Sequence, residues 1–184
     1  MRTSICDILG IDVPILQAPL GGTGFDARLA AAVCNAGGLG MLHLWRADPE
    51  TLRRQVSELR LLTDRPFAVN LNLEFPQAER LEVCLDLGMP VLSFFWGDLS
   101  ELAPRAKAAD VIILHTIGSL QEATAAADCG VDVVVDQGWE AGGHVRSAVA
   151  TMALVPDVVD AVAPVPVMAA GGITDGRGMA AALA

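Results

Sequence analysis

The sequence lacks several features that would place it in common functional classes. It has no run of about 18 uninterrupted apolar residues, although hydrophobic residues make up 53% of the chain and its mean hydropathy is +0.47. Residues 1–20 lack the long apolar stretch of a signal peptide, because Asp7 and Asp12 interrupt them. Neither a membrane span nor a secreted product is predicted, and a cytoplasmic location is the default expectation.

Clustered cations and paired cysteines are also missing. The chain carries 12 Lys and Arg residues against 22 Asp and Glu, a formal net charge of −10, and its basic residues are scattered. A nucleic-acid surface needs clustered Lys and Arg, so no nucleic-acid partner is expected. Cys6, Cys34, Cys84 and Cys129 form no C-x-x-C pair. They indicate neither zinc binding nor redox exchange, and reduced core residues are predicted instead.

What the chain does have is a regular alternation of short β-branched segments and longer Ala- and Leu-rich helical patterns. Such alternation is typical of parallel strands joined by crossover helices, so an α/β protein is predicted. The predicted strands are Val13–Gln17, Leu39–His43, Phe67–Leu71, Val91–Phe95, Val111–His115, Val133–Gln137 and Val165–Ala169. The predicted helices are Ala27–Asn35, Pro49–Leu62, Gln77–Leu87, Ser100–Ala109, Ser119–Asp128 and Thr151–Val162.

Two architectures fit this alternation, an open doubly wound sheet and a closed eight-fold barrel. An open nucleotide-binding sheet favours G-x-G-x-x-G directly after its first strand, and residues 18–24 read APLGGTG. About seven regular units instead predict a (β/α)₈ TIM barrel that is incomplete, since such barrels need roughly 250 residues. Residues 1–184 are interpreted as one barrel domain truncated at its C-terminus, with open strand edges that favour a homo-oligomer.

Barrel enzymes place their chemistry at the C-terminal ends of the strands, where this chain has polar residues. Asn70 lies at the end of a strand predicted to be buried, where an amide needs partners that a ligand ring would supply. His115 ends another strand and is predicted to face the barrel mouth. His144 follows two glycines in a loop, and an imidazole that titrates near neutrality suits proton abstraction from a carbon acid. Each histidine also has a simpler interpretation, His115 as a cap of backbone groups and His144 as a surface residue.

The turn at Gly171 and Gly172 resembles an anion site. Two residues without Cβ atoms let a phosphate approach the backbone, and amides at a helix start favour negative charge. Ordinary turn geometry also uses glycine, so the turn alone leaves both interpretations open.

Five segments together resemble the nitronate monooxygenase family, formerly called 2-nitropropane dioxygenases. They occur in family order and read PILQAPLGG at 14–22, NAGGLG at 35–40, FAVNL at 67–71, QGWEAGGHV at 137–145 and PVMAAGGITDGRGMAAAL at 166–183. Members of this family are FMN-dependent (β/α)₈ enzymes. The resemblance implies oxidation of an alkyl nitronate or nitroalkane with O₂, and no metal.

The resemblance also assigns site residues by position. It implies that FMN lies against the turn formed by Gln17, Ala18, Pro19 and Leu20, with Asn70 at the flavin. It places Gln137, Gly142 and Gly143 near the ring and ribityl chain, and Gly171 and Gly172 at the phosphate. His144 matches the histidine of the family's Gly-Gly-His signature, and His115 stands where some relatives carry a histidine proposed as the base.

The chain departs from the family pattern in two places. Many members read Ser-Phe-His-Phe-Gly where Ser93–Gly97 reads SFFWG, so one candidate proton carrier is absent. The family continues into an eighth strand with a Gly-Thr-Arg turn and then a mostly helical lid domain, and neither is in this sequence. The resemblance leaves two alternatives, an FMN-dependent enoyl-ACP reductase or NADH:quinone reductase of the same superfamily, and an inactive flavin-binding fragment.

Overall fold

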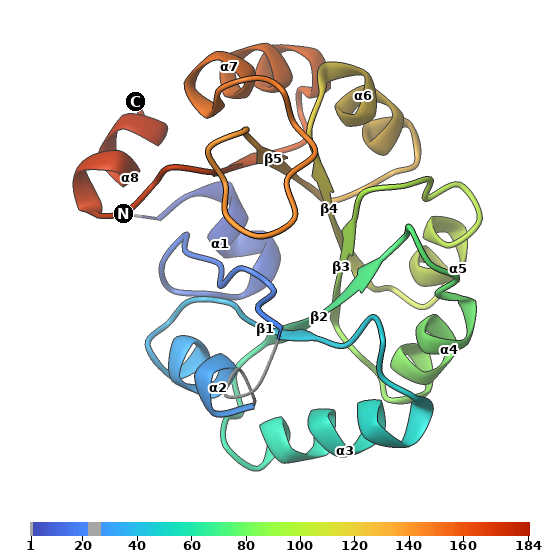
Figure 1. Cartoon of the computed structure of the whole chain (residues 1–184). Helices are drawn as coiled ribbons and strands as arrows, with labels where there is room; N and C mark the ends of the chain where they lie inside the picture. Colours follow the sequence, from blue (N-terminus) through green and yellow to red (C-terminus); the bar gives the residue numbers. More distant parts are fainter. Residues whose placement is uncertain (1, 22–26) are drawn as a thin grey trace. The chain divides into compact units, whose positions relative to one another are not determined.

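The computed structural model describes residues 2–21 and 27–184, so Gly22 of the first matching segment lies outside the described residues. The chain divides into two compact units, Met1–Ile113 (unit 1) and Leu114–Ala184 (unit 2). Figure 1 shows helices and strands alternating along both units.

The described residues of unit 1 form three parallel strands, with helices between them. Its elements are α1 (Ser4–Leu9), α2 (Ala27–Asn35), β1 (Gly40–His43), α3 (Pro49–Arg60), β2 (Phe67–Asn72), α4 (Ala78–Asp86), β3 (Val91–Phe95) and α5 (Ala103–Lys107). Strand β2 pairs in parallel with both β1 and β3. Helix α3 shows why the sequence folds this way, because its fully buried Leu52, Val56 and Leu59 share one face. The Asp48 carboxylate caps it by accepting a 2.7 Å hydrogen bond from the Thr51 amide.

Unit 2 begins within strand β4 and shows the same alternation of strands and helices. Its elements are β4 (Ile112–Ile117), α6 (Leu120–Asp128), β5 (Val133–Gln137), α7 (Thr151–Val162), β6 (Val167–Ala170) and α8 (Gly176–Ala182). Strand β5 pairs in parallel with both β4 and β6. Helices α6 and α7 pack against each other and against β5 (Figure 1). The parallel α/β prediction is therefore confirmed in each unit.

The predicted count of seven strand-helix units is not confirmed, because residues 2–21 and 27–184 form six strands. The segment Val13–Gln17 forms a single parallel bridge, between Leu16 and Leu39. Its backbone follows β1 only briefly, through the bonds Leu39 N to Ile15 O and Gln17 N to Leu39 O. At the next step the side chain of Gln17, and not its backbone, bonds to the Met41 backbone, so no regular strand forms. Closure into a (β/α)₈ barrel stays a prediction.

None of the four cysteines forms a disulfide, and Cys129 is only partly buried, so the prediction of core cysteines holds for the other three. Cys6, Cys34 and Cys84 are buried, and burial raises the pKa of the Cys84 thiol to about 12. Among residues 2–21 and 27–184, no group of three or more His, Cys, Asp or Glu side chains could hold a metal ion. No helix in the same residues is long and apolar enough to cross a membrane.

Candidate functional site

In unit 1, the side chain of Gln17 bonds to the backbone of β1. Its Nε2 donates to the Met41 carbonyl at 3.0 Å, and its Oε1 accepts from the Met41 amide at 3.5 Å. This amide therefore extends the parallel ladder by one step. The residues that follow it in the predicted cofactor turn are accessible, because Ala18 and Leu20 are exposed and Pro19 is partly buried.

Asn70, the other predicted flavin residue of unit 1, also has partners within the protein. It is 2% exposed, and its Nδ2 donates to the Ser93 hydroxyl at 3.1 Å and lies 3.3 Å from the Ser93 carbonyl. The strands supply this contact directly, since Asn70 and Ser93 are register partners on β2 and β3. A ligand ring is therefore not needed to satisfy this donor, and the reason given for Asn70 from sequence was incomplete.

In unit 2, a loop from Gly138 to Ala150 brings two predicted site residues together. Gln137 ends β5, and its Nε2 donates to the His144 carbonyl at 3.0 Å. The Gln137 Oε1 is buried and has no hydrogen-bond partner in the structure. Between these residues, Gly142 and Gly143 are exposed, and a Cβ built on either glycine would meet no atom within 4 Å. The loop thus combines open space with a buried acceptor that lacks a donor.

The turn after β6 is joined to this loop through Thr151, the first residue of α7. The Thr151 hydroxyl lies 3.1 Å from the Gly171 carbonyl and 3.0 Å from Glu140 Oε2, and the same Glu140 oxygen accepts from the Thr151 amide at 2.9 Å. That amide bond is the main reason why the pKa of Glu140 is lowered. A Cβ on Gly138 would lie 2.1 Å from the Thr151 hydroxyl oxygen. Thr151 therefore holds the loop and the turn in one arrangement.

The structure shows why glycine is favoured at positions 171 and 172, for reasons of packing and backbone conformation that the sequence did not reveal. Gly171 has φ +123°, and a Cβ there would lie 2.7 Å from the Thr151 hydroxyl. Gly172 has φ +67°, a left-handed conformation that favours glycine. Helix α8 begins only at Gly176, and its first turn is capped by Asp175, which accepts from the Arg177 amide at 2.9 Å. An anion at this turn would thus meet the amides of the two glycines, which donate no hydrogen bond within the described residues, and not the helix terminus.

His115 lies inside β4, not at its end as predicted, and is 3% exposed. Its register partner is Val134, whereas Asp136 pairs with Ile117 and Gln137 with Ala170. Because side chains alternate along a strand and register partners share a face, His115 and Asp136 lie on the face opposite to Gln137. The structure therefore brings His144 to Gln137 and does not bring His115 there.

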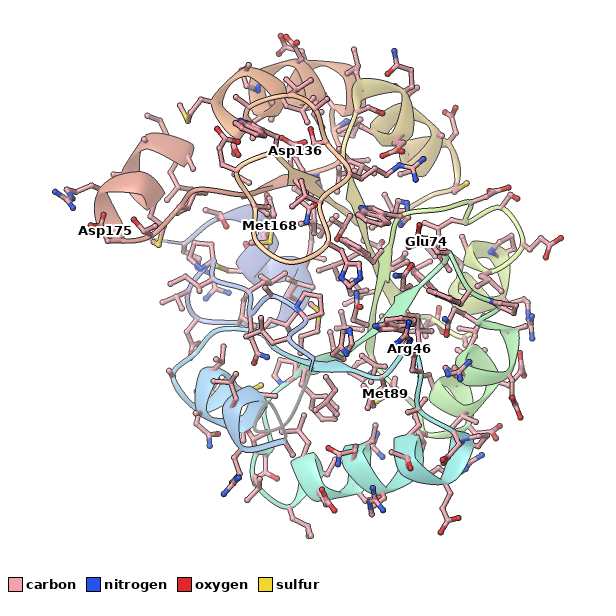
Figure 2. All side chains as sticks on the ribbon, viewed as in Figure 1. Arg46, Glu74, Met89, Asp136, Met168 and Asp175 are labelled. Carbon is pink, nitrogen blue, oxygen red and sulfur yellow. The ribbon has the colours of Figure 1, made fainter. Side chains whose placement is uncertain are left out.

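Asp136 is the acidic residue that sequence reasoning missed (Figure 2). It is 0% exposed, and neither carboxylate oxygen has a hydrogen-bond partner in the structure. Burial raises its pKa to about 7, because an ionised carboxylate is poorly solvated there. An acid at the end of the apolar run Val133–Val135 was the signal that could have identified it.

These features define a parallel α/β protein whose strand-end loops combine glycine turns with unsatisfied buried polar groups. A family model described as nitronate monooxygenase matches residues 2–79 and 72–184. The chain belongs to this family, and the family resemblance found in the sequence is confirmed.

Three similar proteins show the range of this family. A protein of Mycobacterium tuberculosis (strain ATCC 25618 / H37Rv) named (3aS,4S,5R,7aS)-5-hydroxy-7a-methyl-1-oxo-octahydro-1H-indene-4-carboxyl-CoA dehydrogenase is 39% identical over 100% of the chain and 52% of its own length. The structure of FabK from Thermotoga maritima matches with a TM-score of 0.94 and 40% identity, over 100% of this chain and 58% of that chain. A nitroalkane oxidase from Streptomyces ansochromogenes matches with a TM-score of 0.88 and 33% identity, over 98% and 64%. The chain thus spans about half the length of the CoA dehydrogenases it matches.

Proposed function

We propose that this chain forms part of an FMN-dependent oxidoreductase that oxidises alkyl nitronates or nitroalkanes with O₂. The proposal rests on three polar groups of unit 2 that have no hydrogen-bond partner within the described residues. Gln137 Oε1 is a buried acceptor without a donor, and the amides of Gly171 and Gly172 donate no hydrogen bond to the described part of the protein. Flavin mononucleotide offers a ring N–H and ribityl hydroxyls for the first and a phosphate for the second.

The residues present in unit 2 fit FMN. In unit 2, Gly142 and Gly143 leave open space beside Gln137, so that a ring or ribityl chain can approach the backbone. In unit 1, the turn Gln17–Leu20 and Asn70 would contact the cofactor, with Gln17 and Asn70 held rigidly by β1 and β3. When bound, FMN supplies the electron-transfer chemistry that amino-acid side chains lack.

His144 is the proposed base for neutral nitroalkanes. Its side chain is exposed while its carbonyl is fixed by Gln137, so the imidazole projects from a loop whose base is held in place. The imidazole would accept the proton on the carbon next to the nitro group, which leaves the nitronate anion as the form to be oxidised. A positioned general base typically contributes 10²- to 10⁴-fold to such a step.

The test compares a neutral nitroalkane with its pre-formed nitronate in the protein that contains this chain. His144→Ala should lower kcat/KM for the neutral substrate about 100-fold or more and that for the nitronate much less. His115→Gln serves as the matched control, because His115 lies on the other face of the sheet from Gln137. Equal losses on both substrates would assign His144 to binding, and a loss confined to His115→Gln would transfer the base role to that residue.

A second candidate is an FMN-dependent reductase or dehydrogenase that acts on an acyl thioester. Two observations favour it. The matches to the CoA dehydrogenase and to FabK are 39% and 40% identical, against 33% for the nitroalkane oxidase. In addition, Ser93–Gly97 lacks the histidine that many nitronate-oxidising members carry. Anaerobic mixing of the FMN-loaded protein with NADH discriminates the two candidates, since flavin bleaching at the rate of turnover supports the reductase and slow bleaching supports the nitronate oxidiser.

A further inference from the structure

The loop that carries His144 packs on the turn between β4 and α6. A Cβ built on Gly118, the residue after β4, would lie 2.9 Å from the Ser147 amide nitrogen and 3.1 Å from the Ser147 Cα. A side chain at position 118 would therefore overlap the loop backbone. Because glycine has none, the two segments contact each other backbone to backbone, three residues after His144.

Glu122 joins the same two segments through its two carboxylate oxygens. Its Oε2 accepts from the Gly118 amide at 2.8 Å, and its Oε1 accepts from Arg146 Nε at 2.5 Å. Ser119 caps α6 by accepting from the Glu122 amide at 3.3 Å, and in a capping box the glutamate would bond to the Ser119 amide in return. The carboxylate instead bonds one residue further back, to Gly118, and also to the loop. A residue in the first turn of α6 is thus an anchor for the loop that carries His144.

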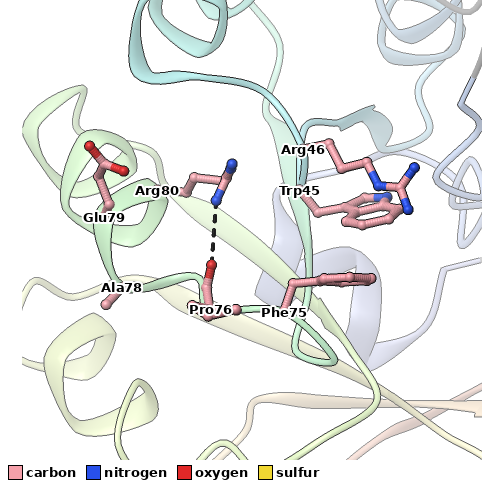
Figure 3. Close-up of a pocket in the computed structure, with 7 residues that line it drawn as sticks. All are labelled: Trp45, Arg46, Phe75, Pro76, Ala78, Glu79 and Arg80. Atoms are coloured by element: carbon pink, nitrogen blue, oxygen red, sulfur yellow. Dashed lines mark hydrogen bonds between the residues drawn. The ribbon is translucent and has the colours of Figure 1, made fainter.

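A second arginine that joins two segments, Arg80 of unit 1, shows what is particular to Arg146. Arg80 donates to the carbonyl of Ala47 at 2.7 Å and to that of Pro76 at 3.3 Å (Figure 3). Both of these acceptors are neutral. Arg146 donates to a carboxylate, and hydrogen bonds between ionised groups are about twice as strong as neutral ones. The anchor at Glu122 can therefore be weakened by removing one charge, without a change in the size of the side chain.

The expected effect of this ion pair is local. The Arg146 and Glu122 side chains are 50% and 27% exposed, and pairs that water screens to this extent contribute little to global stability. Just before His144, however, Gly142 and Gly143 are exposed and have open space around them. Loop segments with few buried contacts open at a low free energy. An anchor close to the histidine therefore changes the order of the loop more than the stability of the fold.

His144 lies between two such anchors. Its carbonyl accepts from Gln137 Nε2 at 3.0 Å, and Arg146, two residues later, is bonded to Glu122. With the backbone fixed on both sides, the imidazole can project in fewer directions. A base must lie within hydrogen-bond reach of the proton it removes, and a displacement of about 1 Å can lower a rate about 100-fold.

We propose that Glu122 is a positioning residue for His144, which it holds through Arg146 and through the turn at Gly118. The inference rests on the proposed function, in which His144 is the base, and extends it to a side chain outside the predicted cofactor site. Without the ion pair, His144 is still present but lies less often within reach of the proton. The turnover of a neutral nitroalkane then falls, whereas substrate binding and the turnover of the nitronate do not.

The first test uses Glu122→Gln in the protein that contains this chain. The variant should lower kcat for a neutral nitroalkane about tenfold, with little change in KM and none for the pre-formed nitronate. Glu82→Gln is the matched control, because Glu82 forms an ion pair of similar exposure with Arg105 in unit 1. Arg146→Lys keeps the charge and should recover part of the rate that Arg146→Met loses.

The second test measures the order of the loop without any reaction. The Trp139 amide closes the loop by donating to the Val149 carbonyl at 2.9 Å. In Glu122→Gln this amide should exchange its hydrogen at least about fivefold faster, while the amides of α7 keep their rates. Glu82→Gln should exchange as the parent does. Unchanged exchange at Trp139 in Glu122→Gln would overturn the proposal.

The two tests together separate this inference from the proposed function. If exchange at Trp139 becomes faster and the neutral nitroalkane is still turned over at the parent's rate, the positioning role is wrong, and the effect of His144→Ala still decides the function. If His144→Ala affects both substrates equally, the proposed function fails. The exchange rates alone then decide whether Glu122 orders the loop.

Discussion

In unit 1, the polar side chains of Gln17 and Asn70 bond to neighbouring strands, whereas in unit 2 Gln137 and the adjacent Asp136 keep buried oxygens that have no hydrogen bond. Gln17 and Asn70 bond to strands β1 and β3. Gln137 Oε1 and both Asp136 carboxylate oxygens are buried without a hydrogen bond. Since an unsatisfied buried polar group costs about 1 to 3 kcal/mol, the bonds of Gln17 and Asn70 favour the stability of unit 1, whereas Gln137 and Asp136 keep oxygens that a ligand could satisfy.

The largest effect is expected at Gly138, a glycine of unit 2. Gly138→Ala should destabilise the protein by about 3 kcal/mol or more, because its Cβ would overlap Thr151 at 2.1 Å from the hydroxyl oxygen and 2.4 Å from the amide nitrogen. Gly142→Ala is the matched control, since its Cβ meets nothing within 4 Å. Urea unfolding should show a change within about 0.5 kcal/mol for the control.

The same pair also tests where the cofactor lies. If FMN fills the space beside Gly142, then Gly142→Ala should weaken FMN binding while leaving the free energy of unfolding almost unchanged. A Gly142→Ala protein that keeps full FMN affinity would mean that the open space faces solvent only.

A second test uses pH to probe the unsatisfied acid of unit 2. The folded pKa of Asp136, about 7, is above the ordinary value of 3.8. Below about pH 4 the carboxyl is protonated in both states. Between about pH 4 and 7 the unfolded chain ionises while the folded chain keeps its proton, so the free energy of unfolding falls as the pH rises. Above about pH 7 the full penalty is present.

Asp136→Asn should remove this penalty. The variant should be more stable than the parent by on the order of 2 to 4 kcal/mol at pH 8, with a much smaller difference at pH 4. Asp157→Asn, at an exposed position of α7, is the control and should show no such pH dependence. If Asp136→Asn is less stable than the parent at pH 8, then the ionised carboxylate has a partner that stabilises it.

The smallest expected effect compares the two site glutamines. Gln17→Met removes both bonds to Met41 and should lower the free energy of unfolding by about 1 to 2 kcal/mol. Gln137→Met removes one bond and one unsatisfied oxygen, so its effect on stability should stay within about 1 kcal/mol, while FMN affinity falls about tenfold. The comparison fails if Gln137→Met unfolds more easily than Gln17→Met and still binds FMN normally.

The regular elements were predictable because their patterns are local. Strands β3 and β5 and helices α2 and α7 have the predicted bounds, since β-branched runs and amphipathic helical faces are visible in sequence. The predicted strand Val13–Gln17 failed because the Gln17 side chain replaces the backbone in the ladder. Strand propensities of residues do not reveal that a side chain will take the place of a backbone group.

The predicted site was harder to judge from sequence because it depends on contacts across the chain. The alternation of β4 and β5 separates His115 from Gln137, which only the register reveals. The need for Gly171 was visible as a pattern, but its cause is the Thr151 hydroxyl, 20 residues away in sequence. Asp136 was overlooked because a single acid beside an apolar run does not by itself show that it is buried without a partner.

Thr151 connects three segments of unit 2 through its hydrogen bonds. Its one hydroxyl hydrogen faces two acceptors, Glu140 and the Gly171 carbonyl, and its amide also binds Glu140. These bonds connect the turn at Gly171 and the loop that carries Glu140 and His144 to the start of helix α7. A ligand that displaced the glycine turn would therefore strain the bonds to the loop that carries His144 without contacting the imidazole.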